Sequence, residues 1–250
     1  MRVVVTRPEP DCSRTVALLE QRGHVPVPMP LTRIEDLLIS AAPINELPAG
    51  AAATTSANAI RAWQKLGIDA AYLTRPLYAV GEQTGQTARD AGFNDVRIGA
   101  GDGASLALRI RQDIASEALV VTAEAPLLYA AGRTRHPQFE ITIEAANVPY
   151  HPVELYDVSR VSYSTDFVRS VFLMPEPVAV LLYSRKAAEL FFLAIPADLR
   201  DKLLNKSKFF CLSENVVNAI PTPIRDKVNT ATHPDEHHLL SLLDNDGAES

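Results

Sequence analysis

The chain has 250 residues, of which 47% are hydrophobic and 22% are charged, and its formal net charge at pH 7 is −6. This length suits two globular domains of about 110–150 residues each. The acidic balance argues against a broad basic surface for nucleic acid or for anionic membranes. No apolar run approaches the ~18 residues of a membrane span, and the N-terminal stretch lacks the apolar core of a signal peptide, so we expect a cytoplasmic protein.

Short β-branched or apolar runs alternate along the chain with amphipathic stretches. The expected strands cover residues 3–5, 25–29, 51–54, 77–80, 96–98, 127–130, 148–150, 178–182, 209–212 and 227–231. The expected helices lie between Pro10 and Gly23 and over residues 57–66, 84–91, 104–114, 137–146, 185–193, 214–220 and 235–243. Strands that alternate with helices of this length predict βα units and parallel sheets.

An internal repeat gives the order of the parts. Ser56 opens a helix after a strand, and Ser184 does so 128 residues later (184 − 56); Gly81 and Ser213 are related in the same way at 132 (213 − 81). We call the block that contains Ser56 and Gly81 B and the block that contains Ser184 and Ser213 B′, and the segments that precede these blocks A and A′. The order along the chain is therefore A, B, A′, B′, and each domain needs one A-type and one B-type block. Periodicity alone leaves two arrangements open, A with B and A′ with B′, or A with B′ and B with A′.

The common catalytic and metal motifs are absent from the sequence, including GxSxG, HExxH, CxxC and the Walker loop. The glycine-rich run at 99–103 lacks the Lys-Ser/Thr of a phosphate loop and is interpreted as a βα turn that needs positive φ. His237 and His238 are neighbours in an expected helix, so they point about 100° apart and should not both ligate one metal. Cys12 and Cys211 stand almost a full chain apart, which indicates free thiols. No metal site is predicted.

Turns rich in threonine, serine and glycine follow the expected strands, and they contain Thr55, Ser56, Gly81, Thr84, Ser105, Ser184 and Ser213. Plain helix capping explains any one of them. Several together matter more, because open α/β sheets bind ligands at the carboxyl ends of their strands, where helix N-termini offer N–H groups to anions. Two such edges would suit a molecule with many carboxylates.

Three arginines and a tyrosine supplement these turns. Arg7, Arg133 and Arg135 follow strand-like runs, where guanidinium groups could bind carboxylates in a forked geometry. Arg7 could equally be a surface ion-pair residue. Tyr156 lies in a segment that could cross between domains, where an amphipathic tyrosine packed at a domain edge is the alternative to a chemical role.

Seven segments resemble the uroporphyrinogen-III synthase family and follow its order along the chain. They are VTRP (5–8), GHV (23–25), PL (30–31), TSANA (55–59), AVGEQT (79–84), LYAAGRTR (128–135) and VELY (153–156). The resemblance implies an α/β fold of two flavodoxin-like parallel-sheet domains, the second inserted in the first, joined by a two-stranded linker. Residues 1–36 and 160–250 would form the first domain, and residues 37–159 the second.

The same resemblance implies a lyase of heme biosynthesis that closes hydroxymethylbilane with inversion of ring D and loss of water. It implies no metal or organic cofactor, and the expected partner is the linear tetrapyrrole, with transient contact with the preceding pathway enzyme allowed. The absence of any extra apolar helix in the sequence fits a monomer. Tyr156 matches the tyrosine proposed in that family to assist the departing hydroxyl. The expected substrate-binding residues are Thr6, Arg7, Thr55, Ser56, Gly81, Thr84, Ser105, Gly132, Arg133, Ser184 and Ser213.

Two turns depart from the family's pattern. The second Thr-Ser turn reads Tyr183-Ser184, and a turn that usually carries glycine and threonine reads Ser213-Glu214. Glu214 suits a helix N-terminus, but its charge would repel a substrate carboxylate. Two alternatives stay open: a non-catalytic two-lobed protein that binds a small anion, and a scaffold protein of the same fold, which the altered turn at Ser213 makes conceivable.

Overall fold

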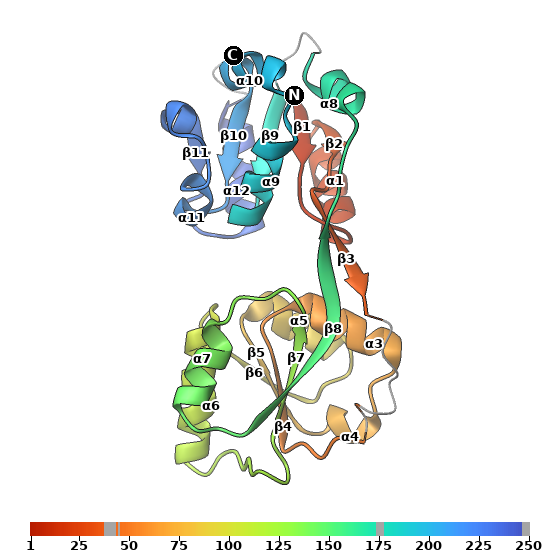
Figure 1. The fold of residues 1–250 in the computed structure, drawn as a ribbon, viewed down its shortest axis with the longest axis vertical. Coiled ribbons are helices and arrows are strands. Elements are labelled where there is room, and N and C mark those ends of the chain that lie inside the picture. Colours follow the sequence, from red (N-terminus) through yellow and green to blue (C-terminus); the bar gives the residue numbers. More distant parts are fainter. Residues whose placement is uncertain (38–43, 45, 174–177, 247–250) are drawn as a thin grey trace. The chain divides into compact units, whose positions relative to one another are not determined.

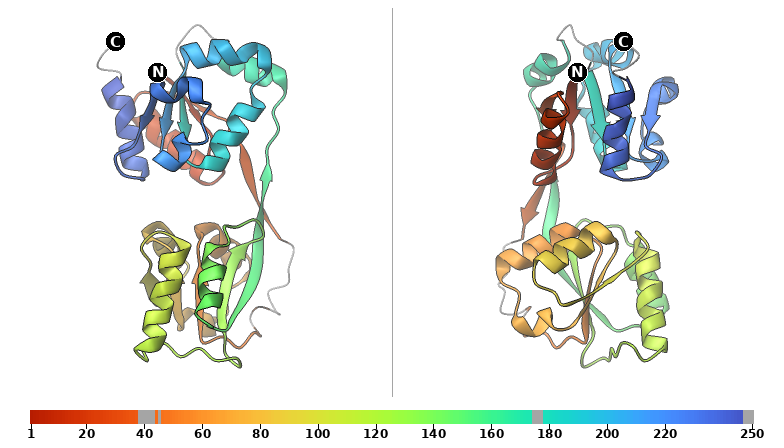
Figure 2. Two further views of the ribbon diagram at one scale, coloured as in Figure 1. Left: turned by 60° about the vertical axis from the view of Figure 1, so that its left-hand side comes forward. Right: turned by 180° about the vertical axis from the view of Figure 1, so that it is seen from behind.

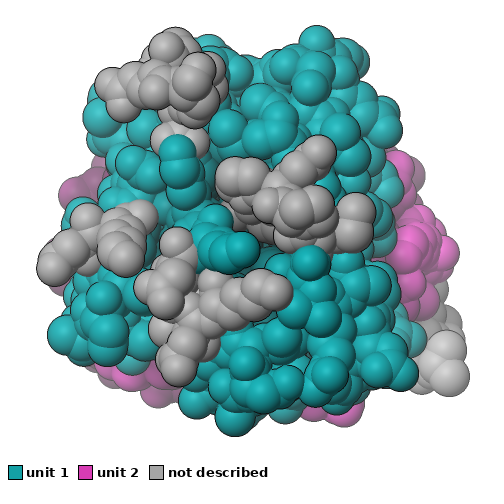
Figure 3. Space-filling view, turned by 90° about the horizontal axis from the view of Figure 1, so that it is seen from above, with its two compact units in different colours: residues 1–33, 159–250 teal, residues 34–158 magenta. Residues whose placement is uncertain are grey.

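The structure is a computed structural model that describes residues 1–37, 44, 46–173 and 178–246. The chain divides into two compact units (coloured separately in Figure 3). Unit 1 consists of residues 1–33 and 159–250, and unit 2 of residues 34–158. Unit 1 is thus built from both ends of the chain, and the limits expected from the sequence lie within three residues of these.

Unit 1 contains a five-stranded sheet in the order β11-β10-β9-β1-β2, whose paired strands are all parallel. The strands are β1 (Arg2–Val5), β2 (Val25–Pro28), β9 (Val178–Leu182), β10 (Lys208–Cys211) and β11 (Val228–Thr230). The helices are α1 (Asp11–Gln21), α8 (Thr165–Phe172), α9 (Arg185–Ala194), α10 (Ala197–Lys206), α11 (Glu214–Val217), the 3-10 helix η1 (Thr222–Lys227) and α12 (Glu236–Asp246).

Helices cover both faces of this sheet (Figures 1 and 2). Successive strand residues alternate between two apolar clusters, because side chains along a strand point to opposite faces. Val4 packs with residues of α8 to α11, whereas Val3 and Val5 pack with Leu19 of α1 and Leu239 of α12. The β-branched run at 3–5 is therefore fully buried, as in other sheets covered on both sides.

Unit 2 contains a six-stranded sheet in the order β3-β8-β7-β4-β5-β6. The strands are β3 (Thr32–Asp36), β4 (Ala51–Thr54), β5 (Pro76–Ala79), β6 (Asp95–Ile98), β7 (Leu127–Gly132) and β8 (Tyr150–Arg160). The helices are α3 (Ala57–Leu66), α4 (Ala70–Leu73), α5 (Glu82–Asp90), α6 (Gly103–Ala115) and α7 (Gln138–Ala145). The pairs β4–β5, β4–β7, β5–β6 and β7–β8 are parallel.

Two apolar layers sandwich the sheet of unit 2. Ala52 and Leu128 face α3, whose Trp63 is fully buried between Tyr72 and Phe93. The opposite layer consists of alternate strand residues packed on α6 and α7. Among the described residues, no helix is long and apolar enough to span a membrane.

β3 and β8 form the connection between the units. The unit boundaries fall at 33/34, inside β3, and at 158/159, inside β8, and the two strands are neighbours in the sheet order. The sequence pattern predicted a strand only at 148–150, whereas β8 runs over 150–160. Pro152 and the polar residues that follow mask the strand pattern there, although this segment was expected to cross between domains.

Each sheet has one switch point, defined here as the gap between two neighbouring strands from which the chain proceeds in opposite directions. In unit 1 it lies between β1, which leads to β2, and β9, which leads to β10 and β11. In unit 2 it lies between β4, which leads to β5 and β6, and β7, which leads to β8. Because ligands of open α/β sheets bind at the carboxyl ends of the strands beside such points, these two positions are the first candidates for a site.

Candidate functional site

A pocket of about 630 Å³ lies at the switch point of unit 2. It is lined by Thr55, Ser56, Val80, Gly101, Asp102, Gly103, Thr134, Arg135, His136, Gln138, Phe139 and Tyr156. These residues follow β4, β5, β6 and β7 or belong to β8. We call this cavity the unit 2 pocket. Thr55, Ser56 and Tyr156 were expected site residues, and the fold brings them together.

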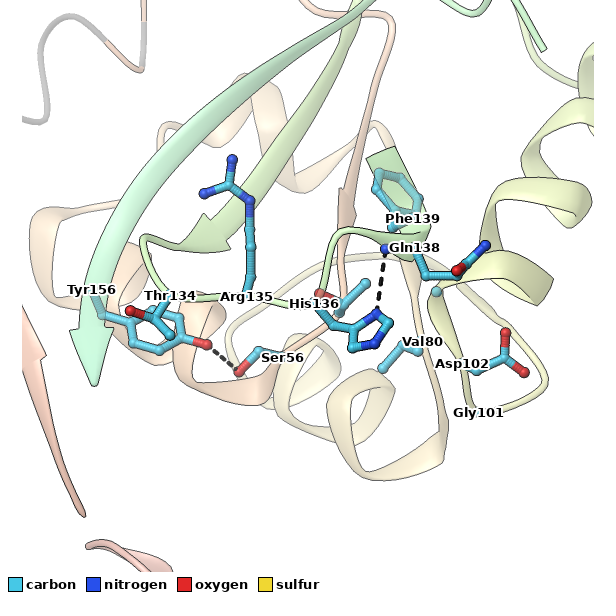
Figure 4. Close-up of a pocket in the computed structure, with 12 residues that line it drawn as sticks. Ser56, Val80, Gly101, Asp102, Thr134, Arg135, His136, Gln138, Phe139 and Tyr156 are labelled. Atoms are coloured by element: carbon cyan, nitrogen blue, oxygen red, sulfur yellow. Dashed lines mark hydrogen bonds between the residues drawn. The ribbon is translucent and has the colours of Figure 1, made fainter. Parts of the chain in front are cut away.

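The hydroxyl of Tyr156 donates a hydrogen bond to Oγ of Ser56 at 2.9 Å (Figure 4). Ser56 is the N-cap of α3, and its Oγ also accepts from the backbone N–H of Asn58 at 3.2 Å. Because both lone pairs of this oxygen are then engaged, the Ser56 hydroxyl proton remains available to a ligand. Burial raises the pKa of Tyr156, so its phenol stays protonated at neutral pH.

Gly132, at the end of β7, makes room for the Tyr156 ring. A Cβ placed on Gly132 would lie 2.7 Å from Cζ of Tyr156 and 3.0 Å from its hydroxyl oxygen. The sequence predicted a substrate-binding role for Gly132, and its contact with Tyr156 gives it a packing role as well. Its binding role stays a prediction.

We expect Gly132→Ala to destabilise unit 2 by about 1–3 kcal/mol, because the added methyl group forces the buried Tyr156 ring to move. Gly81→Ala is the matched control: Gly81 has an extended φ of −162°, and its Cβ would meet nothing closer than 3.7 Å. That change should cost less than about 1 kcal/mol. Urea unfolding of the two variants measures the difference, and equal losses would contradict the packing role.

The arginines beside the pocket are paired with carboxylates. Arg135 binds Glu140 through two nitrogens, at 2.8 and 3.0 Å, and binds Glu154 at 3.1 Å. Arg133 reaches the other oxygen of Glu154 at 3.1 Å. Hydrogen bonds from Arg135 and Arg133 lower the pKa of Glu154. These four side chains sum to zero charge, so attraction for an anion here depends on backbone dipoles more than on net charge.

Three helix N-termini supply such dipoles. The N-cap of α3, Ser56, and the first residues of α6 and α7, Gly103 and Gln138, line the pocket. Gly103 lets α6 and α7 approach closely, since a Cβ on it would lie 3.1 Å from both the Cβ and the backbone nitrogen of Phe139. Free N–H groups at helix N-termini and the helix dipole favour anions. The Asp102 carboxylate already caps the N-terminus of α6, so the N-termini of α3 and α7 are the ones suited to an incoming carboxylate.

One wall of this pocket, formed by the turn at 99–103, was not predicted from the sequence. The run at 99–103 was expected to be a turn with positive φ, and Gly101 has a φ of +106°. The same turn also places Gly101, Asp102 and Gly103 in the pocket wall. The turn follows β6, a strand of the same sheet as β4 and β5, and this position in the sequence could have indicated that it belongs to the site.

His136 was also missed. It lies in the unit 2 pocket near Gln138, whose backbone N–H donates to Nδ1 of His136 at 3.4 Å (Figure 4). In that tautomer Nε2 carries the proton and can donate to a ligand. No motif in the sequence singled out this histidine.

Other expected site residues of unit 2 serve the local fold. Gly81 is the N-cap of α5, and Thr84 is buried in its first turn. The backbone N–H and hydroxyl of Ser105 both donate to the Asp102 carboxylate at 2.8 Å. Ser105 lines a second, shallower cavity of about 410 Å³. Gly81, Thr84, Ser105 and Arg133 are not among the residues that line the unit 2 pocket, and their binding roles remain predictions.

Unit 1 holds the remaining expected residues at the carboxyl edge of its own sheet. The hydroxyl of Thr6, which is fully buried, donates to the carbonyl oxygen of Leu181 at 2.6 Å. Ser184 caps α9 by accepting from the N–H of Ala187, and Ser213 precedes α11. Arg7 is ion-paired, with Asp11 at 3.0 Å and with Glu236 at 2.7 Å.

One group of side chains near α12 has metal-ligand chemistry. Ligand atoms of Asp235, His237 and His238 lie within 4.8 Å of one another on the exposed surface. The Asp235 carboxylate accepts from the backbone N–H of His238 at 2.9 Å, and its two oxygens lie 2.8 and 2.7 Å from the ring Nδ1. Asp235 thus caps the helix. The two neighbouring histidines were expected to point too far apart to ligate one metal, and the structure corrects this, because their ligand atoms come within 4.8 Å of each other and of the Asp235 carboxylate.

Comparisons with known proteins agree on one family. A family model described as "Uroporphyrinogen-III synthase HemD" matches residues 13–241. Among curated protein sequences, none matches the chain significantly. Solved structures with a similar fold include the uroporphyrinogen-III synthetase of Helicobacter pylori, at 14% identity and a TM-score of 0.62 over 98% of each chain. A mutant uroporphyrinogen III synthase of Thermus thermophilus has 14% identity and a TM-score of 0.59 over 100% of each chain.

At this identity the structural likenesses show the fold alone: two α/β domains with parallel sheets, as the sequence resemblance implied. The family model covers most of the chain, including every strand of unit 2 and the residues of the unit 2 pocket. The chain therefore belongs to the uroporphyrinogen-III synthase family.

Proposed function

We propose that this protein closes hydroxymethylbilane into uroporphyrinogen III, with inversion of ring D and release of water. The observation that carries the proposal is the Tyr156 hydroxyl at the wall of the unit 2 pocket, hydrogen-bonded to Ser56. Tyr156 also stands at the position where the family resemblance implies a proton donor. In this proposal the enzyme is a cofactor-independent lyase that acts in the cytoplasm on a linear tetrapyrrole.

The chemistry requires little beyond a proton and a fixed geometry. The electron-rich pyrrole expels its hydroxyl as the C–O bond breaks, and Tyr156 supplies the proton that turns the departing hydroxyl into water. The ring D carbon that carries the methylene bridge bonds to the carbon that lost the hydroxyl, and the bond from ring D to that bridge breaks and re-forms at the other α-carbon of ring D, which inverts the ring. The tyrosinate takes back the proton that this second α-carbon loses. Burial keeps Tyr156 protonated before the step, and the Ser56 contact orients its hydroxyl.

Orientation accounts for the product. Because the free substrate tends to close without inverting ring D, the protein must hold the reactive ends so that one geometry of attack prevails. The helix N-termini of the unit 2 pocket are suited to binding the acetate and propionate groups that would fix this pose. The binding roles of Thr55, Ser56, Gly132 and Arg133 belong to this proposal.

The decisive experiment measures which isomer forms. Purified protein is incubated with freshly generated hydroxymethylbilane, and the type III and type I products are separated after oxidation to porphyrins. We expect the type III isomer to dominate, at a rate well above that of buffer alone. Formation of type I alone, at the rate of the buffer control, would contradict the proposal and favour a non-catalytic anion-binding or scaffold protein.

A further inference from the structure

The switch point of unit 1 is filled by one of the protein's own carboxylates. Arg7 follows β1 and Tyr183 follows β9, so the two side chains flank this point. Glu236, the first residue of α12, extends its side chain between them. Ligands of open α/β sheets bind at the corresponding position, so the Glu236 carboxylate stands where a ligand would be expected.

Four donors from three segments surround the Glu236 carboxylate. Its Oε1 lies 2.7 Å from Nη1 of Arg7, 2.5 Å from Oγ1 of Thr15 and 3.3 Å from the hydroxyl of Tyr183. Its Oε2 lies 3.2 Å from Nη2 of Arg14. We call Arg7, Arg14, Thr15 and Tyr183 the Arg7 cradle. Charged and neutral donors that converge in this way are the recognition pattern of a carboxylate-binding site.

Most of the cradle is also held by contacts other than those to Glu236. The Arg7 guanidinium stacks over the Tyr183 ring, with its carbon 4.3 Å from the ring centre. Thr15 is fully buried, and the side chain of Arg7 is only 12% exposed. Asp11 binds the second nitrogen of Arg7 at 3.0 Å and Arg14 at 3.0 Å. Arg7, Thr15 and Tyr183 therefore keep these contacts without help from Glu236, whereas the Arg14 side chain is 45% exposed and is held by Asp11.

The charges around the cradle favour another carboxylate when the Glu236 carboxylate is absent. Arg7 and Arg14 carry two positive charges, and Asp11 and Glu236 carry two negative charges. If the Glu236 side chain moves away, the site keeps a net charge of +1 (two minus one) and four donors. An incoming carboxylate would restore neutrality.

Glu236 can leave without unfolding its helix. It is the N-terminal residue of α12, its side chain is 20% exposed, and the helix is anchored by the buried Leu239, Leu240 and Leu243. Asp235 caps the helix independently, through the N–H of His238. A rotation of the Glu236 side chain alone would therefore expose the cradle to solvent.

We propose that the Arg7 cradle is a carboxylate-binding subsite that Glu236 occupies in the free protein and that a carboxylate of the substrate takes over on binding. The substrate's identity, an acetate or propionate arm of the linear tetrapyrrole, rests on the proposed function. The subsite itself does not, because its donors should bind any small carboxylate that fits once the Glu236 carboxylate is removed.

Acetate is the probe, and thermal unfolding of the full chain at constant ionic strength is the readout. We expect Glu236→Ala to gain about 2–4 °C in Tm at an acetate concentration about five times its Kd, relative to chloride. The wild type should not respond, because its own carboxylate fills the cradle. Glu214→Ala is the matched control: Glu214 is the exposed first residue of α11, and its removal should create no acetate response.

A second variant separates the cradle from a general effect of acetate. Glu236→Ala combined with Arg7→Met should lose the response, and a response that survives would overturn the proposal. Equal responses of the wild type and Glu236→Ala would overturn it too. With hydroxymethylbilane, Glu236→Gln should lower KM, because a neutral amide competes less well than a carboxylate for the cradle, and a KM that does not fall would overturn the takeover by the substrate. If the chain has no synthase activity but Glu236→Ala binds acetate, the proposed function fails while the subsite stands.

Discussion

Tyr156→Phe is expected to lower kcat for type III product formation by about a hundredfold, the contribution typical of a positioned general acid. The variant removes only the hydroxyl that donates to Ser56 at 2.9 Å and leaves the ring packed against Gly132. The loss of one hydrogen bond should cost about 1 kcal/mol of stability, so the fold should persist and KM should stay near that of the wild type. Steady-state kinetics with hydroxymethylbilane measure both parameters.

Two controls distinguish proton donation from substrate orientation. Ser56→Ala removes the hydrogen-bond partner but keeps the phenol, so it should lower kcat less than Tyr156→Phe does. The type III fraction made by Tyr156→Phe should remain high, because the pocket that orients the rings is intact. An undiminished rate in Tyr156→Phe would exclude Tyr156 as the proton donor, and a shift to the type I isomer would indicate that the hydroxyl orients the substrate instead.

The pH dependence of the wild type gives a further check on the same residue. Burial raises the pKa of Tyr156, so the phenol remains protonated through neutral pH. Activity that depends on this proton should be lost only above the ordinary tyrosine pKa of about 10. A loss of activity that begins near neutral pH and is absent in Tyr156→Phe would contradict that assignment.

The elements most faithfully predicted from sequence are those with strong local signals. The strand at 51–54 and the helix at 57–66 were predicted with the observed bounds, because Ser56 caps the helix and Gly67, with a φ of +89°, ends it. The helices α8 and α10 were missed, although Ser164 caps α8 in the same manner. α10 directly follows another helix, α9, and α8 follows a part of β8 that was not predicted as a strand. The alternation of strands and helices therefore indicates neither helix.

The site was predictable where it depends on position in a βα unit and unpredictable where it depends on partners far along the chain. Ser56 and Tyr156 were each expected, but their hydrogen bond joins residues 100 positions apart. Arg7 could be interpreted as a free donor or as an ion-pair residue. Its pairing with Glu236, 229 positions away, follows from the tertiary fold alone, because no local pattern links α12 to β1.

A buried network of polar side chains connects the strands and the helix that carry part of the pocket wall. Oδ2 of Asp113, on α6, accepts from the hydroxyl of Tyr78 at 2.7 Å and from Nη1 of Arg97 at 3.0 Å. Its Oδ1 accepts from Nε of Arg109 at 2.9 Å. The network ties β5 and β6 to α6, and the turn between β6 and α6 contributes Gly101 to the pocket wall. Loss of these hydrogen bonds should therefore also disturb the pocket wall at Gly101.

We expect Asp113→Ala to destabilise the protein by about 3 kcal/mol, because it leaves the largely buried Arg97 guanidinium without this carboxylate. Asp95→Ala is the matched control: Asp95 binds the same guanidinium at 3.0 Å, but its side chain is 43% exposed. That loss should stay below about 1 kcal/mol. Urea unfolding measures both values, and similar losses in the two variants would show that burial adds nothing to the Asp113 pair.

The free energy of unfolding, measured as the pH is lowered, tests the same network in the wild type. Burial acts to raise the pKa of Asp113, but hydrogen bonds from Tyr78, Arg109 and Arg97 outweigh it and lower that pKa. A carboxyl whose pKa is lower in the folded than in the unfolded state stabilises the fold above its unfolded value of about 3.9 and loses that contribution as pH falls further. The stability difference between wild type and Asp113→Ala should therefore shrink below about pH 4. A difference that stays constant from pH 7 to pH 3 would mean that Asp113 stabilises the fold by packing, with no contribution from its charge.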